Sequence, residues 1–314
     1  YPFASQNRKD FDNLLDVYLD AVFFARLDPL DFAQEGHRLK FEEIDNPQSP
    51  LTFKGVVFNE MKGAMSSVTS SLWQTLSKYV FPTTTYHHNS GGEPDCIPDL
   101  TYEQLVAFYR SHYHPSNAIF MTYGDIQAVE HQARFETQAL SRFERLNHTI
   151  CVPDEKRYLA PLRVEESYAL DEHDTRGKTH IVTAWLLGRS ADLKTHLQAQ
   201  LLTAVLLDNA ASPLQQALET STLGTSPSPL CGLEDSQKEL MFMAGLEGSE
   251  AEHTGQVEYL ILDVLQNIAD KGVPQDRIDA CLHQLELQQR EITGDGYPYG
   301  LQLILHALNS ATHR

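Results

Sequence analysis

The chain has 314 residues, of which 41% are hydrophobic and 21% are charged, so it has ordinary globular composition and is long enough for two domains. Its 43 acidic and 24 basic side chains give a net charge of −19, which argues against a nucleic-acid partner, because phosphate neutralisation needs clustered Lys and Arg. No apolar run approaches the roughly 18 residues of a membrane-spanning helix, so we expect no membrane partner.

Helical periodicity dominates the first part of the chain. Apolar residues at three- and four-residue steps predict helices over residues 9–26, 31–43, 52–79, 101–112 and 127–145. Thr101 and Gln104 have the spacing of a capping box at the start of the fourth of these helices. A loop over 83–98 and a short apolar strand over 118–123 complete the prediction for this part.

A change in composition follows at residues 147–163, which hold two prolines and no regular period. We interpret them as an interdomain linker between domains 1–146 and 164–314. Beyond the linker, the patterns predict strands over 164–170, 180–187 and 240–246 and helices over 192–207, 213–221, 253–271, 274–292 and 300–309. Strands and helices mix without regular alternation, so the sequence predicts the α+β class.

No complete catalytic motif is present in the sequence. It lacks G-x-S-x-G, a P-loop and G-x-G-x-x-G, and neither H-E-x-x-H nor H-x-x-E-H occurs among its 14 histidines. The four cysteines are widely spaced without C-x-x-C, which favours reduced thiols in an intracellular compartment, the cytoplasm or an organelle matrix. We interpret the remaining local candidates as structural or surface features: His87 and His88, His112 and His114, the turn at 90–92, Cys96 and Cys231.

The segment 55–64 (GVVFNEMKGA) is the most unusual local feature. On a helix, Glu60 shares its face with small and apolar residues. A carboxylate in such surroundings is costly to bury unless it is paired or holds a metal ion. The alternative is a Glu at a helix boundary that reaches water or pairs with a lysine such as Lys62.

The same segment resembles the part of presequence proteases that carries the last zinc ligand; these enzymes are a branch of the pitrilysin/insulinase class of zinc metallopeptidases. Further stretches that resemble this family are 1–7 (YPFASQN), 31–39 (DFAQEGHRL), 90–94 (SGGEP) and 112–117 (HYHPSN). The resemblance extends over essentially the whole chain. It is highly specific in the first third and moderate in the second half.

The resemblance implies two insulinase-like domains, each a mostly antiparallel sheet layered with helices. The first would be truncated at its N-terminus and the second, 164–314, catalytically silent. It also implies an H-x-x-E-H motif upstream of Tyr1, whose two histidines bind zinc with Glu60 as the third ligand and whose Glu activates water. Because one ligand of three cannot hold catalytic zinc, we expect this chain alone to be inactive and free of metal, with Glu60 pointing into the cavity where the ion would lie.

The resemblance further implies the partners of the parent protein. These are short unstructured peptides, which add a strand to a sheet edge, and a C-terminal half of the parent chain that closes over the first half. Since the chain opens at Tyr1 without a methionine, we expect a processed or trimmed piece of a longer protein. The alternative is a paralogue without zinc that serves as a scaffold or binds peptides; the presence of Glu60 in its family context argues against it.

Overall fold

The computed structural model describes residues 2–147, 150–171, 173–291 and 296–313. The chain divides into two compact units, each assembled from separate segments. Unit 1 comprises residues 1–65, 89–152 and 293–308, and unit 2 comprises residues 66–88, 153–292 and 309–314. Helices and antiparallel strands in these units confirm the predicted α+β class. Over the described ranges, no helix combines the length and apolar character needed to cross a bilayer.

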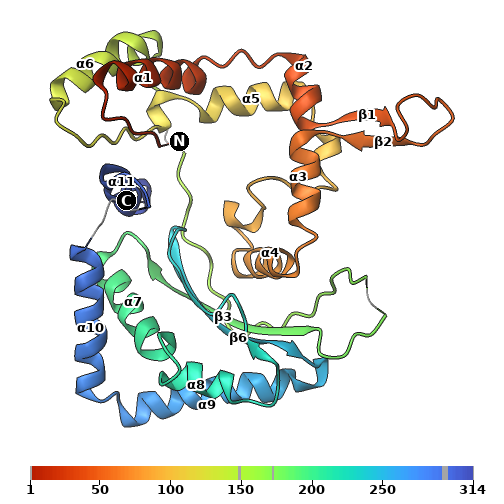
Figure 1. Cartoon of the computed structure of the whole chain (residues 1–314), viewed down its shortest axis with the longest axis vertical. Coiled ribbons are helices and arrows are strands. Elements are labelled where there is room, and N and C mark those ends of the chain that lie inside the picture. The colour runs from red at the N-terminus through yellow and green to blue at the C-terminus, as the bar shows by residue number, and fades with distance from the viewer. Residues whose placement is uncertain (1, 148–149, 172, 292–295, 314) are drawn as a thin grey trace. The chain divides into compact units, whose positions relative to one another are not determined.

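Unit 1 is mainly helical. Its elements are α1 (Arg8–Phe23), α2 (Pro29–Asp31), a π-helical turn (Phe32–Gly36), β1 (Arg38–Phe41), β2 (Leu51–Lys54), α3 (Val56–Ala64), α5 (Tyr102–His112), α6 (Ala128–Gln138), most of α11 (Tyr299–Thr312), and 3-10 turns at Ile97–Asp99, Pro115–Asn117 and Leu140–Arg142. The core of this unit forms where α1 packs beside α6 (Figure 1). Leu15, Leu19 and Phe23 recur at four-residue steps on α1 and pack against Phe135 and Ala139.

The two short strands of unit 1 form an antiparallel hairpin that projects from α2 and α3 (Figure 1). Leu39 lies opposite Phe53, and Phe41 lies opposite Leu51. Since side chains alternate across a strand, these four apolar residues share one face of the hairpin. The other face carries the basic residues of both strands.

Unit 2 contains the larger sheet. Its elements are α4 (Val68–Val80), β3 (Thr179–Arg189), α7 (Leu193–Leu207), α8 (Pro213–Glu219), β4 (Ser226–Pro227), β5 (Gly232–Glu234), β6 (Glu239–Ser249), α9 (Thr254–Lys271), α10 (Gln275–Arg290), and 3-10 turns at Thr85–His87 and Ala251–His253. β6 is central and pairs antiparallel with β3, β4 and β5.

The sheet of unit 2 is covered on both faces. Phe242, Ala244 and Leu246 of β6 belong to the core shared with α7, α8 and α9. Met241 and Met243 point the other way and pack with Phe81 beside α4. Figure 1 shows α8 and α9 along one side of β3 and β6 and α4 on the other. The result is a helix–sheet–helix arrangement. Successive side chains of β6 point to opposite faces of the sheet, so this strand contributes to a core on each face.

The five helices predicted in the second half and the strands over 180–187 and 240–246 are confirmed, with boundaries within a few residues. The predicted helix over 274–292 is α10, and residue 292 lies outside the described residues, as do 148 and 149 of the predicted linker. The predicted domains 1–146 and 164–314 and the linker 147–163 between them stay a prediction. In this structure, residues 66–88 pack with unit 2.

Several predicted elements are wrong. Residues 31–43 are a short helical turn followed by β1, because residues 38–41 pair with β2. The predicted helix over 52–79 is divided among β2, α3 and α4. The Ser67 side chain accepts the Ser70 N–H and so caps the start of α4. The helix over 127–145 ends at Gln138.

The strands predicted over 118–123 and 164–170 are also wrong. Neither segment has a strand partner among the residues that the structure describes. An apolar run favours extended backbone, but a strand exists only where its N–H and C=O groups find a neighbouring strand.

Candidate functional site

Glu60, the predicted metal ligand, lies in the middle of α3 in unit 1. The helix follows β2 directly, and its N-cap Gly55 supplies no side-chain cap. Glu60 is exposed and lines neither of the two pockets described below. The expectation that its carboxylate points into a cavity is therefore not met in this structure, and its role as a metal ligand stays a prediction.

Close packing fixes the start of α3. A Cβ added to the buried Gly55 would lie 1.9 Å from the carbonyl oxygen of Gly36, at the end of the π-helical turn. Only glycine allows the two backbones to approach this closely. The position of the helix that carries Glu60 is therefore set by backbone contact with the segment before the hairpin.

The neighbour of Glu60 anchors the other side of α3. The Met61 sulfur accepts a hydrogen bond from Asn89 Nδ2 at 3.6 Å, and the same amide nitrogen donates to the Gly92 carbonyl at 3.1 Å. A Cβ on Gly91 would lie 2.1 Å from that sulfur. The Met61 side chain therefore packs against the turn at 90–92, a contact that the sequence pattern did not indicate.

A catalytic zinc ion needs about three protein donors. Over residues 2–147, 150–171, 173–291 and 296–313, no three His, Cys, Asp or Glu side chains lie together in a way that could hold a metal ion. The residues in these ranges therefore do not fit a zinc site by themselves, and no chemical step is assigned to such an ion here.

The histidine pairs contact protein groups that explain their positions. His87 Nδ1 lies 2.9 Å from the Lys78 carbonyl oxygen, and the His87 and His88 ring centroids are 4.9 Å apart. His112 stacks on Phe108, with ring centroids 3.8 Å apart. These contacts are those of surface and structural histidines.

Cys231 also has a structural setting. Its sulfur accepts the Gly245 N–H at 3.3 Å and lies 3.5 Å from the Gly245 carbonyl oxygen. Burial raises the pKa of the Cys231 thiol, and the hydrogen bonds from Gly245 and Ser228 only partly offset this. A thiol that resists ionisation is a poor nucleophile.

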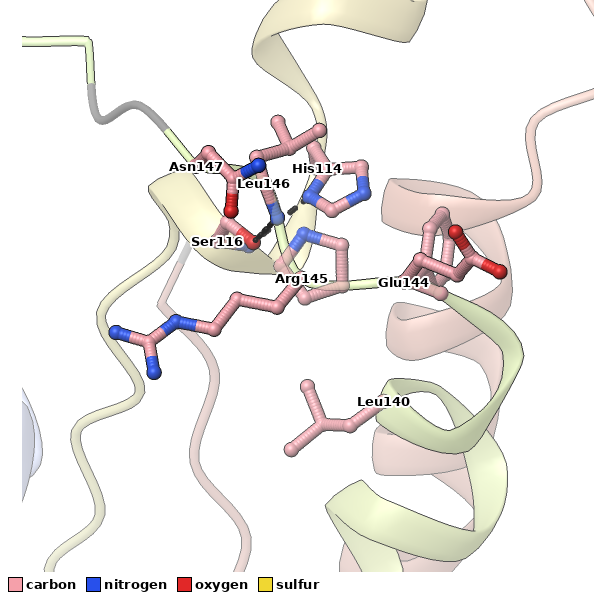
Figure 2. Close-up of a pocket in the computed structure, with 9 residues that line it drawn as sticks. His114, Ser116, Leu140, Glu144, Arg145, Leu146 and Asn147 are labelled. Carbon is pink, nitrogen blue, oxygen red and sulfur yellow. Dashed lines mark hydrogen bonds between the residues drawn. The ribbon is translucent and has the colours of Figure 1, made fainter.

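The larger pocket of unit 1 has a volume of about 560 Å³ and lies between the 3-10 turn after α5 and residues 140–147. His114 Nδ1 accepts the Ser116 N–H at 3.1 Å, and the Ser116 hydroxyl accepts the Leu146 N–H at 3.0 Å. Figure 2 shows the Arg145 guanidinium pointing away from the His114 ring. The polar groups of this pocket thus fix the chain segments that form it.

The smaller pocket has a volume of about 270 Å³ and lies where the hairpin meets α3. Arg38, Lys40 and Lys54 line it from the hairpin, and Asn59 lines it from α3. The sequence prediction misses these cations because it places residues 31–43 and 52–79 in helices. Read with period two, Arg38 and Lys40 share one face of a strand, and this signal could have found them.

Comparison with known proteins identifies the class. Residues 99–285, more than half of the chain, match the family model described as the peptidase M16 inactive domain. The chain therefore belongs to the M16 peptidase family, which confirms the resemblance.

Within this family, the chain is similar to presequence proteases. The chain is 40% identical to the mitochondrial presequence protease of Xenopus tropicalis over 100% of this chain and 30% of that protein. It is 37% identical to presequence protease 1, chloroplastic/mitochondrial, of Arabidopsis thaliana over 98% of this chain and 29% of that protein. The chain thus spans about 30% of the length of the curated relatives that it matches.

Solved structures support the fold. A peptidase M16 inactive domain from Pseudomonas fluorescens aligns with a TM-score of 0.55 at 18% identity, covering 82% of this chain and 60% of that chain. A protease from Helicobacter pylori aligns with a TM-score of 0.54 at 18% identity, covering 82% of this chain and 61% of that chain. At this identity the likeness establishes the architecture alone.

Proposed function

We propose that this chain is part of a zinc-dependent endopeptidase that degrades short unstructured peptides, such as cleaved targeting sequences. The observation that carries the proposal is Glu60 on α3, in a segment that resembles the zinc-ligand segment of presequence proteases, within a chain 40% identical to a presequence protease. Glu60 supplies one zinc ligand, and an H-x-x-E-H motif elsewhere in the same polypeptide supplies the other two.

We propose no activity for the 314 residues alone. The sequence contains no H-x-x-E-H, and the described part of the chain has no group of three metal-binding side chains. Domain 164–314 is proposed to be catalytically silent and to form part of the wall around the peptide. The relatives are named mitochondrial or chloroplastic/mitochondrial, and we place this protein in an organelle matrix on that ground.

The test uses a longer polypeptide that carries both H-x-x-E-H and this chain. There, Glu60→Gln is expected to lower the zinc content by at least about tenfold and to abolish cleavage of an unstructured peptide, since an amide is a weaker ligand than a carboxylate. Zinc is measured by atomic absorption after dialysis. Glu136→Gln, at an exposed position of α6, is the control and should keep both zinc and activity. Full zinc and full activity in the Glu60 variant would show that the assignment is wrong.

A paralogue without zinc, serving as a scaffold or a peptide-binding subunit, is the second candidate. The exposed position of Glu60 favours it. The sequence upstream of Tyr1 in the parent protein distinguishes the two proposals. An intact H-x-x-E-H supports the enzyme, and a degraded motif supports the scaffold.

A further inference from the structure

His131 is a buried histidine in the core of unit 1, where α1 packs beside α6 (Figure 1). It lies on α6 and is only 5% exposed. Its ring makes an edge contact with Phe11 of α1, with ring centroids 5.9 Å apart, and stacks on Phe135 with centroids 6.0 Å apart. A titratable ring therefore occupies a place between two helices where an apolar side chain would be ordinary.

One nitrogen of this ring has no hydrogen-bond partner. His131 Nδ1 is buried, and within the described ranges no donor or acceptor bonds to it. In a protonated imidazole both ring nitrogens carry a hydrogen. Protonation of His131 would therefore place a charge in the core and leave a buried N–H at Nδ1 without an acceptor, and both are unfavourable.

The carboxylates beside this core are already paired with arginines. Arg8 forms ion pairs with Asp12 and Glu130, and Arg134 forms ion pairs with Asp12 and Asp16. These three acids and two guanidinium groups bind one another across α1 and α6. No carboxylate of this cluster is left over to neutralise an imidazolium at position 131.

The other segments that pack on this core supply no acid. Residues 2–7 and 118–123 contribute Phe3 and Phe120 and contain no charged side chain. The turn after α6 carries Arg142, whose guanidinium carbon lies 4.8 Å from the centre of the Phe24 ring. These segments therefore add only one further cation to the charged groups of α1 and α6.

These surroundings give the sign of a pH effect. Burial, Arg8 and Arg134 lower the pKa of His131 below its ordinary value of 6.5, and Asp12 offsets this only in part. The neutral ring contributes its full share of stability above pH 6.5 and loses it as the pH falls through the folded-state pKa. The packing of α1 on α6 should therefore weaken below pH 6.5.

We propose that His131 is an acid-sensitive latch between α1 and α6. The neutral ring belongs to the apolar core with Phe11 and Phe135, and the protonated ring leaves it and lets the two helices separate. The surrounding ion pairs do not produce this effect, because carboxylates and guanidinium groups keep their charges at about pH 5.5 to 7.5. The latch does not depend on zinc, on Glu60 or on the proposed peptidase function.

The part of α1 that is released is its first half. The Tyr109 hydroxyl of α5 donates to the Val22 carbonyl oxygen at 2.8 Å and accepts the Ala25 N–H at 3.0 Å. These bonds hold the end of α1 against α5 without involving His131. Phe11 lies near the start of α1, so the separation concerns residues 8–16 and the facing part of α6.

The test measures hydrogen exchange of amides in α1 and α6 of the 314-residue chain at pH 7.5 and pH 5.5, corrected for the intrinsic exchange rates. Each pH unit below 6.5 can reduce protection by up to about tenfold until the folded-state pKa is reached. We therefore expect protection factors in residues 8–16 and 128–138 to fall about three- to tenfold. His131→Leu replaces the ring with an apolar group of similar volume and should abolish this fall.

A matched control removes a histidine outside the core. His306→Gln, at an exposed position of α11, should keep the fall in protection at pH 5.5. Equal protection of α1 and α6 in the native chain at both pH values, or the same fall in His131→Leu, would overturn the proposal. A titration of the His131 C2 proton by nuclear magnetic resonance needs no variant and should give a midpoint below 6.5. A midpoint at or above 6.5 would also overturn it.

Discussion

Glu155 is a carboxylate in unit 2 that is only 5% exposed. It accepts hydrogen bonds from the Thr83 backbone N–H at 3.0 Å, the Thr83 hydroxyl at 2.5 Å and the Lys156 N–H at 2.7 Å. Burial acts to raise the pKa of the Glu155 carboxyl, but these donors outweigh burial and leave the pKa lowered. The fold therefore stabilises the charged form, and that form ties the predicted linker to the loop after α4.

Glu155→Gln is expected to lower the free energy of unfolding of unit 2 by about 1–3 kcal/mol, because an NH₂ group replaces an acceptor that faces buried donors. Urea unfolding followed by tryptophan fluorescence measures this unit, since the two tryptophans of the chain, Trp73 and Trp185, both lie in it. Glu165→Gln is the control at an exposed position and should change the value by less than about 0.5 kcal/mol. Equal midpoints for the two variants would contradict the prediction.

The same carboxylate predicts the sign of a pH effect. Its pKa in the folded state lies below the ordinary value of 4.5, so its contribution to stability is present above that value and is lost as the pH falls through the folded-state pKa. The stability difference between the native chain and the Glu155→Gln variant should therefore be full at pH 7 and shrink below pH 4.5. A difference that stayed constant down to pH 3 would contradict this account.

At the scale of elements, the packing of α3 requires glycine at position 55 but not at position 63. A Cβ at Gly55 meets the Gly36 carbonyl oxygen, whereas a Cβ at Gly63 meets nothing within 4 Å. Gly55→Ala should therefore destabilise unit 1 by about 1–3 kcal/mol through overpacking. Gly63→Ala is the matched control and should stabilise the helix by up to about 1 kcal/mol. Hydrogen exchange of the amides in residues 56–64 measures both changes, and similar protection in the two variants would contradict the packing argument.

Elements with local signals were predictable from the sequence. The capping box at α5 is present with both of its bonds, from the Gln104 N–H to Thr101 Oγ1 at 3.2 Å and from the Thr101 N–H to Gln104 Oε1 at 2.8 Å. Such bonds join residues three apart, so the pattern contains them. The hairpin joins residues 38–41 to 51–54, and its pairing is not written in either segment alone.

The candidate site likewise has features that the sequence predicts and features that it does not. The motif over 55–64 predicted that Glu60 lies on a helix, which α3 confirms. Its exposure and the basic pocket beside it could not be predicted, because both depend on how α3, the π-helical turn and the hairpin pack together. Burial is a property of the assembled elements, and a sequence pattern indicates it only when the packing partner is known.

At the scale of the whole chain, length and the supply of metal ligands have to be considered together. The chain spans about 30% of their length, and its described residues bring no three metal-binding side chains together. Membership of the M16 peptidase family therefore does not by itself place a metal ion on the described residues.

The corresponding prediction concerns metal removal. Because a ligand that binds only the folded state raises the unfolding temperature by mass action, a chelator lowers that temperature only when a metal was bound. EDTA should therefore leave the thermal midpoint of the 314-residue chain unchanged, and atomic absorption should find well below one zinc ion per chain after dialysis. A polypeptide that adds an H-x-x-E-H motif to this chain is the positive control, and its midpoint should fall with chelator. Retention of one zinc ion by the 314 residues, with a midpoint that EDTA lowers, would contradict the prediction and would require ligands other than an upstream histidine pair.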